Sequence, residues 1–301
     1  MNLSRWVRGL ITGSAMLLAP LFCLADDGRP VIDLILPVDN APLREFATQV
    51  QTHNRDYDVR QFIQAPPPQA EQGDILVTVS DSLLEVIAGE DYPQKVALYV
   101  SETAFLDHKA PGVSAVYSNQ PLRRQLALTS AILDQRPARI AVPYLNPYFL
   151  ENLATAITHY PHLSPKVEAA SADRPTEVIN RLIQQVDVLL ATPEIEIYNA
   201  DTIRSILLSS YRHRTMVIGP NEGFVTAGAL ASVVSQPVHY ALQLNTILKT
   251  AKETGAMPPA DYPREFDVAI NGSVARSLGL SHLNAELLKK RIQDSLSRSG
   301  L

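Results

Sequence analysis

The chain has 301 residues, of which 46% are hydrophobic and 19% are charged, and its formal net charge is −5. This is the composition of a globular protein, and the length suffices for one large domain or two of moderate size. The balance is acidic and no basic stripe suggests a nucleic-acid-binding surface, which needs clustered Lys and Arg, so we expect no nucleic acid as a partner.

The first 25 residues have the features of a cleaved export signal. Arg5 and Arg8 precede the apolar run GLITGSAMLLAPLFCLA, and the chain turns polar directly after it. Small residues at the required positions place the cleavage after Ala25. The apolar run is short for a membrane-spanning helix, and the bulky Phe22 before Cys23 disfavours a lipoprotein. An uncleaved anchor is the remaining alternative.

Cleavage after residue 25 would remove the only cysteine, Cys23, and would move the formal net charge from −5 to −7. The mature chain would then have no disulfide, and its hydrophobic core alone would hold it together. We therefore expect a periplasmic protein with no stable membrane insertion after the signal is cleaved.

Strand-like and helix-like segments alternate along the first half of the mature chain. Short runs of branched apolar residues predict strands, and apolar residues at helical spacing predict helices. The stretch APPPQ (residues 65–69) stands where a crossover helix is expected, so that this crossover should be short or irregular. The predicted strands are 31–36, 57–63, 74–79, 95–100 and 113–117, and the predicted helices are 41–53, 80–89 and 118–133.

The second half repeats this rhythm. Strands that alternate with helices indicate an α/β protein with parallel sheets and helices on both faces. The chain has more strand–helix units than a single sheet usually accommodates. We therefore expect two similar halves with a boundary near residues 135–137. The predicted strands are 138–142, 166–170, 186–192, 215–219 and 230–236, and the predicted helices are 146–160, 174–185, 199–214 and 237–254.

The chain contains none of the common catalytic motifs. It has no G-x-S-x-G nucleophile elbow, phosphate loop, dinucleotide fingerprint or H-E-x-x-H site. His159 and His162 are the one close histidine pair, but Pro161 separates them and no nearby acid completes a metal site. We interpret the pair as a solvated helix end, and we expect no metal and no cofactor.

Two glutamates stand two residues apart in the loop PEIEIYN, which follows the predicted strand 186–192. If the loop is extended, Glu194 and Glu196 point to the same face, as an acid–base pair would require. Because no second catalytic group is visible, a plain loop is the favoured interpretation. A ligand-binding role is the intermediate alternative, since open α/β sheets bind ligands at the carboxyl ends of their strands.

Polar loops follow most of the predicted strands. The helix N-termini beyond these loops offer free N–H groups, which suit an anionic or carboxylate-bearing ligand. The same residue types cap helices, but their convergence on one cleft predicts a small-molecule site. The candidate ligand-binding residues are Asp39, Ser80, Ser101 and Ser118 in the first half, and Tyr144, Thr192, Tyr198 and Asn221 in the second.

Residues 186–280 resemble a known family. A helix carries the pattern YN..TI...LL..YR from Tyr198 to Arg212, and FVTAGALAS and a helix that begins at Pro237 follow it. This arrangement is similar to that of ABC-transporter substrate-binding proteins of the uncharacterised periplasmic component type. The segments QPLRRQLALTSAIL and YPREFDVAINGSVARSLGL resemble further helices and the closing strand of that family.

The resemblance implies the type I periplasmic-binding-protein fold, in which two Rossmann-like lobes with parallel sheets enclose a central cleft and are joined by three crossovers. These crossovers would fall near 136–139, at 230–236 and at 262–270. Lobe 1 would then comprise residues 26–136 and 236–262, and lobe 2 residues 137–235 and 263–301.

The resemblance also implies a function. The chain would be a periplasmic solute-binding protein that captures a small polar ligand, such as an amino acid, for an ABC permease. A ligand-sensing subunit for a membrane histidine kinase or chemoreceptor is the alternative with the same fold. A two-lobed periplasmic enzyme that uses Glu194 or Glu196 is a minor alternative, and we expect no enzymatic activity.

Overall fold

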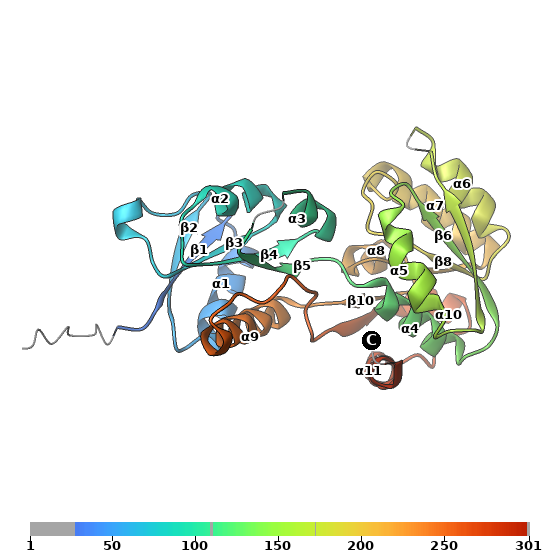
Figure 1. Ribbon diagram of the computed structural model, residues 1–301. Coiled ribbons are helices and arrows are strands. Elements are labelled where there is room, and N and C mark those ends of the chain that lie inside the picture. The colour runs from blue at the N-terminus through green and yellow to red at the C-terminus, as the bar shows by residue number, and fades with distance from the viewer. Residues whose placement is uncertain (1–27, 109–110, 172, 300–301) are drawn as a thin grey trace, which may run out of the picture.

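Two separate β-sheets divide the chain into two lobes that lie side by side (Figure 1). The computed structural model describes residues 28–299 except for 109, 110 and 172, so the expected signal at 1–25 lies outside the described residues. The strand order is β2-β1-β3-β4-β5 in the first sheet and β11-β10-β9-β8-β6-β7 in the second. The prediction of an α/β protein with two lobes is confirmed.

The first sheet is parallel throughout, and helices cover both of its faces. Helix α1 packs on one face together with α9, and α2 and α3 pack on the other. The Pro-rich stretch leads only into the single 3-10 turn η1, as expected from its composition. The elements are β1 (Val31–Leu36), α1 (Ala41–His53), β2 (Asp58–Ile63), η1 (Gln69–Glu71), β3 (Ile75–Val79), η2 (Asp81–Leu83), α2 (Leu84–Gly89), β4 (Gln94–Val100), α3 (Glu102–His108) and β5 (Val113–Tyr117).

The second sheet has one antiparallel strand, β11, which pairs with β10 at the edge and departs from the predicted parallel arrangement. Helices α4, α5, α10 and α11 contribute to the core on one face, and α6 and α7 contribute to the core on the other. The elements are α4 (Leu122–Leu133), β6 (Ala138–Tyr144), α5 (Tyr148–Ile157), β7 (Leu163–Ala169), α6 (Pro175–Ile183), β8 (Val188–Leu190), α7 (Ala200–His213), β9 (Met216–Ile218), α8 (Glu222–Ala227), β10 (Ala231–Val234), α9 (Pro237–Thr254), β11 (Asp267–Ile270), α10 (Gly272–Ser277) and α11 (Ala285–Ser299).

Helix α4 belongs to the second lobe, which corrects the boundary expected near residue 136. Its Leu126 and Leu128 are fully buried in the same core as Ile140 of β6, and the helix packs against α5 and α11. The break at residues 135–137 ends a helix and does not separate the lobes. The chain instead passes between the lobes at residues 118–121, directly after β5.

The chain passes between the lobes twice more. After β10 it enters α9, whose Tyr240, Leu244 and Leu248 are buried in the core of the first lobe. From α9 it returns through residues 255–266 to β11. These two passages overlap the crossovers expected at 230–236 and 262–270, whereas the one expected near 136–139 lies inside the second lobe.

Hydrogen bonds tie the three connecting segments together. Gln120 Nε2 donates to Ser235 Oγ at 2.9 Å, and Ser235 Oγ donates to the carbonyl of Glu265 at 3.0 Å. The buried Arg124 donates to Gln120 Oε1 at 2.9 Å and to the carbonyl of Arg264 at 3.2 Å. Burial lowers the pKa of Arg124 to about 10. Each connecting segment is therefore hydrogen-bonded to at least one of the other two.

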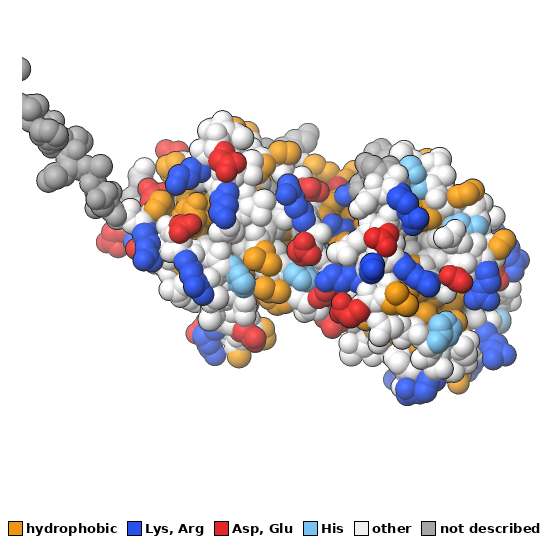
Figure 2. Space-filling model, turned by 90° about the horizontal axis from the view of Figure 1, so that it is seen from below, with side chains coloured by type: hydrophobic (Ala, Val, Ile, Leu, Met, Phe, Trp, Pro, Cys, Tyr) orange, Lys and Arg blue, Asp and Glu red, His pale blue; other side chains and the backbone are white. Residues whose placement is uncertain are grey.

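The surface carries no one-sign stripe on the face shown in Figure 2, where acidic and basic side chains are interspersed over both lobes. Among the helices that the structure describes, none is both long and apolar enough to cross a bilayer.

Candidate functional site

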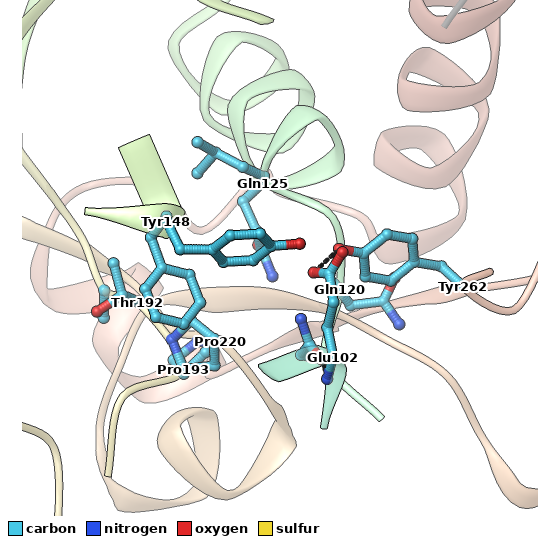
Figure 3. A pocket seen from close by; sticks show the side chains of 12 residues that line it. Glu102, Gln120, Gln125, Tyr148, Thr192, Pro193, Pro220 and Tyr262 are labelled. Atoms are coloured by element: carbon cyan, nitrogen blue, oxygen red, sulfur yellow. Dashed lines mark hydrogen bonds between the residues drawn. The ribbon is translucent and has the colours of Figure 1, made fainter. Parts of the chain in front are cut away.

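A pocket lies between the lobes, at the carboxyl ends of β8 and β9 and beside the start of α3 (Figure 3). This is the place where open α/β sheets bind ligands. Both lobes and two of the connecting segments contribute to its walls. The lining residues are Glu102, Asn119, Gln120, Leu122, Gln125, Tyr148, Phe149, Ala191, Thr192, Pro193, Pro220 and Tyr262.

Aromatic rings form much of the pocket wall. Tyr148 and Phe149 begin α5, with their ring centroids 5.9 Å apart. Tyr262 stands on the third connecting segment, where its ring packs edge-on against Tyr117 at 5.1 Å. Figure 3 shows the Tyr148 hydroxyl directed toward the place where Tyr262 meets Glu102. The pocket therefore offers flat apolar surfaces with polar groups at their edges.

Glu102 is the first residue of α3, and its carboxylate faces the pocket. Tyr262 Oη donates a hydrogen bond to Glu102 Oε2 (Figure 3). Burial, and then this hydrogen bond, raise the pKa of Tyr262, so that the phenol keeps its proton. The backbone N–H of Glu102 donates to Asn119 Oδ1 at 3.2 Å, which fixes the start of α3 against the first connecting segment.

Asn119 does not cap the helix that follows it. Helix α4 starts at Leu122 after Pro121, and no side chain caps it. The Asn119 side chain turns to α3 instead.

Gln125 places a hydrogen-bond donor at the pocket. Its side chain is only 4% exposed, its Oε1 accepts a hydrogen bond from the Val233 N–H at 3.4 Å, and its Nε2 has no partner. Figure 3 shows this amide on the pocket side of α4, near Tyr148 and Gln120. A buried donor without a partner costs about 1–3 kcal/mol, so an acceptor supplied by a ligand would recover that cost.

Glu194 follows the lining residues Thr192 and Pro193, and its carboxylate accepts three hydrogen bonds. Its Oε1 accepts hydrogen bonds from the N–H groups of Leu145 and Asn146, at 2.9 and 2.7 Å, and its Oε2 accepts from Thr192 Oγ1 at 2.7 Å. It is 5% exposed, whereas Glu196 points to solvent. The two carboxylates therefore do not form the pair that an extended loop would give, and Glu194 joins the loops after β6 and β8.

Of the eight candidate residues from the sequence, one lines the pocket: Thr192. Ser118 and Asn221 lie next to the lining residues Asn119 and Pro220. Asn221 caps α8, because its Oδ1 accepts a hydrogen bond from the Phe224 N–H at 3.2 Å. These three candidates are brought to the same part of the molecule.

The other five candidates serve local structure. Asp39 pairs with Arg44 at the surface, Ser80 accepts from the Ser82 N–H, and Ser101 donates to Asp81. Tyr144 ends β6 and pairs with β7. The Tyr198 ring is buried and packs edge-on against Phe224 at 5.6 Å, so that it lies beneath its loop and not in the pocket.

Sequence reasoning missed Glu102, Gln125, Tyr148 and Tyr262. The rule that ligands bind at the carboxyl ends of strands indicated the loops in or beside which Glu102 and Tyr148 stand. The candidates predicted from the sequence were other residues of those loops. Gln125 and Tyr262 follow no strand, and the rule could not find them. Their positions depend on how the connecting segments fold back.

Among the residues that the structure describes, no three His, Cys, Asp or Glu side chains lie close enough to hold a metal ion. His159 and His162 accordingly belong to no such group. The chemistry of the pocket is that of aromatic rings, amides, hydroxyls and one carboxylate.

No family model and no curated protein matches the sequence. Solved structures match its fold. The ligand-free, open structure of a substrate-binding protein with adhesive properties from Clostridium difficile is 14% identical, with a TM-score of 0.64, and covers 83% of this chain and 95% of its own.

Two further structures are similar. An ABC domain in complex with L-Trp from Streptococcus pneumonia has 17% identity and a TM-score of 0.52, covering 84% of this chain and 95% of its own. A conserved domain protein from Vibrio cholerae has 16% identity and a TM-score of 0.54, covering 88% and 98%. At these identities the likeness establishes the fold, which is that of the two-lobed periplasmic-binding proteins.

Proposed function

We propose that the protein is a periplasmic solute-binding protein, which captures a small polar ligand between its lobes and delivers it to an ABC permease. One observation carries this proposal: the pocket is lined from both lobes and holds a buried donor, Gln125 Nε2, without a partner. A ligand that contacts both lobes favours the closed arrangement over the open one, which is how such proteins report occupancy.

Two further observations support binding over catalysis. The carboxylate that an enzyme would have used, Glu194, accepts three hydrogen bonds from its own loops. The similar proteins from Clostridium difficile and Streptococcus pneumonia are described as a substrate-binding protein and as an ABC domain with bound L-Trp.

A thermal-shift screen with amino acids, amines, sugars and other small metabolites tests the proposal. A ligand at about 100 times its Kd should add about 2.7 kcal/mol to the free energy of unfolding, which raises Tm by several degrees. Tyr148→Ala should lose this shift, whereas Tyr211→Ala, which removes an equally large ring that is 63% exposed on α7, should keep it. A protein that no compound stabilises would contradict the proposal.

A further inference from the structure

The side chains that line the pocket carry one negative charge and no positive charge. Among the described lining residues, Glu102 is the only one with a charged side chain, and the other polar side chains are amides and hydroxyls. The guanidinium of Arg124, at the start of α4, donates to Gln120 and to the carbonyl of Arg264. Arg123 lines an adjoining pocket, which shares Glu102, Leu122 and Tyr262 with this one. A ligand carboxylate or phosphate would therefore meet one negative charge and no lining cation.

A cationic group would meet a favourable surrounding at the same place. The carboxylate of Glu102 lies between Tyr262, which is bonded to it, and the hydroxyl end of Tyr148 (Figure 3). A carboxylate gives a charge-assisted hydrogen bond to an ammonium group, and aromatic faces attract cations. An anion beside Glu102 would lose hydration and would meet a like charge.

The rest of the pocket defines the other parts of the ligand. Gln125 has its Oε1 occupied by the Val233 N–H, so its amide can offer only the donor Nε2 to a ligand. A ligand atom that faces it must be a hydrogen-bond acceptor, such as a carbonyl or hydroxyl oxygen. The rings of Tyr148, Phe149 and Tyr262 suit a flat, weakly polar body.

Resting on the proposed function, we infer that the ligand is a ring-bearing amine: a cationic nitrogen faces Glu102, a ring lies against the aromatic wall, an oxygen accepts from Gln125, and no anionic group is present. This excludes organic acids and phosphorylated compounds, and it places zwitterionic amino acids below the corresponding amines in affinity.

Three compounds that share one phenol ring test this inference by isothermal titration calorimetry on the mature protein. Tyramine carries the cation alone, tyrosine carries both charges, and 3-(4-hydroxyphenyl)propanoate carries the anion alone. Tyramine should bind about tenfold or more tightly than either of the others, as expected when a charge-assisted hydrogen bond is gained without an opposing repulsion.

Substitution of Glu102 tests whether its carboxylate causes the preference for tyramine. Glu102→Gln should weaken tyramine binding about tenfold or more. It should also reduce the difference in affinity between the three compounds. Glu45→Gln removes one exposed acid from α1 in the same lobe and should change nothing. Tyr262→Phe keeps the ring but frees the carboxylate of its hydrogen bond, so tyramine binding should be strengthened.

The inference is overturned if tyrosine or the propanoate binds as tightly as tyramine, if Glu102→Gln leaves the affinity for tyramine unchanged, or if none of the three compounds binds. The proposed function is judged separately by the wider screen. Stabilisation by a sugar, an acid or another solute would leave the proposed function standing while this inference fails. If nothing in the screen binds, both fail.

Discussion

The carboxylate of Glu194 holds together two of the loops that form the second-lobe side of the pocket. Two backbone N–H groups after β6 and the hydroxyl of Thr192 after β8 all donate to it. A buried acceptor with three donors orders its surroundings more than any single contact does. Glu194 thus positions the pocket wall without touching the ligand space.

Glu194→Ala should lower the free energy of unfolding by about 3 kcal/mol, because three donors lose their acceptor. Denaturant unfolding measures this loss. Ligand binding should weaken as well, since the loop that carries Thr192 is released. Glu196→Ala, in the same loop but exposed, should stay within about 0.5 kcal/mol. Equal effects of the two substitutions would contradict the role of Glu194 in holding the two loops together.

His239 links the start of α9 to β11. Its Nδ1 accepts a hydrogen bond from the Gln236 N–H at 3.0 Å, and its Nε2 lies 3.8 Å from Asp267. Lys289, Glu265 and Arg124 also act on the ring. Burial is the largest influence, and it lowers the pKa of His239 below its ordinary value of 6.5.

A lowered histidine pKa makes stability depend on pH in one direction. Near pH 6 the unfolded chain binds more protons at this position than the folded protein does, so stability rises with pH. The contribution is present above about pH 6.5 and is lost as the pH falls through the folded-state pKa. His239→Gln should therefore flatten the dependence of Tm on pH between 7 and 5. His213→Gln, at an exposed helix end, is the control, and the same flattening there would count against the assignment.

At the residue scale, the sequence identified the kinds of side chain in the site better than the particular ones. Ser101 and Glu102 are neighbours, but the serine donates to Asp81 and only the glutamate reaches the pocket. Which of two adjacent polar residues faces a cleft depends on the rotation of the first helical turn, and capping patterns leave that rotation open.

Helix α8 illustrates the element scale, because its packing sets the position of Pro220 in the pocket wall. A methyl group on Gly219 would lie 2.4 Å from Cβ of Phe224, and Gly228 ends the helix with φ +128°, a conformation that side chains disfavour. The small residues around FVTAGAL thus allow the helix to sit directly against the end of β9.

Gly219→Ala should lower the free energy of unfolding by about 2 kcal/mol, within the range for overpacking. It should also weaken ligand binding by displacing the turn that carries Pro220. Gly89→Ala is the matched control, since a Cβ there has no neighbour within 4 Å. That change should be neutral or stabilising by about 0.5–1 kcal/mol. Chemical denaturation of both variants measures these changes. An unchanged free energy of unfolding in Gly219→Ala would contradict the close packing of Gly219 against Phe224.

Elements were predicted more reliably than the sheet on which each one packs. The pattern of 118–133 predicted a helix, and α4 is one. Nine of its residues are buried, among them Arg124 and Gln125. A helix that is buried on most sides shows no single apolar stripe, so its pattern does not reveal which lobe it covers. Its contacts with α5, the next helix, and with α11, which is distant in sequence, place it on the second lobe.

For the whole molecule, the central question is whether ligand binding draws the lobes together. Three connecting segments share a hydrogen-bonded network through Gln120, Ser235 and Arg124, so a change of angle at one of them should involve the others. Such concerted bending of a few residues between rigid bodies is the usual form of domain closure. The sequence predicted two lobes, and the family resemblance implied three crossovers. Neither indicated this network, because two of its bonds, from Gln120 to Ser235 and from Arg124 to Arg264, join residues more than a hundred positions apart.

The most direct test measures the distance between the lobes. Cysteines introduced at Asp107 of α3 and Asp201 of α7, both exposed, would carry the spin labels. The only natural cysteine, Cys23, lies in the expected signal, so the mature chain would be labelled at these two positions alone. Pulsed electron paramagnetic resonance then gives the distance with and without the most stabilising compound of the screen. The account predicts a shift to a shorter distance at saturation, whereas saturated binding with an unchanged distance distribution would contradict it.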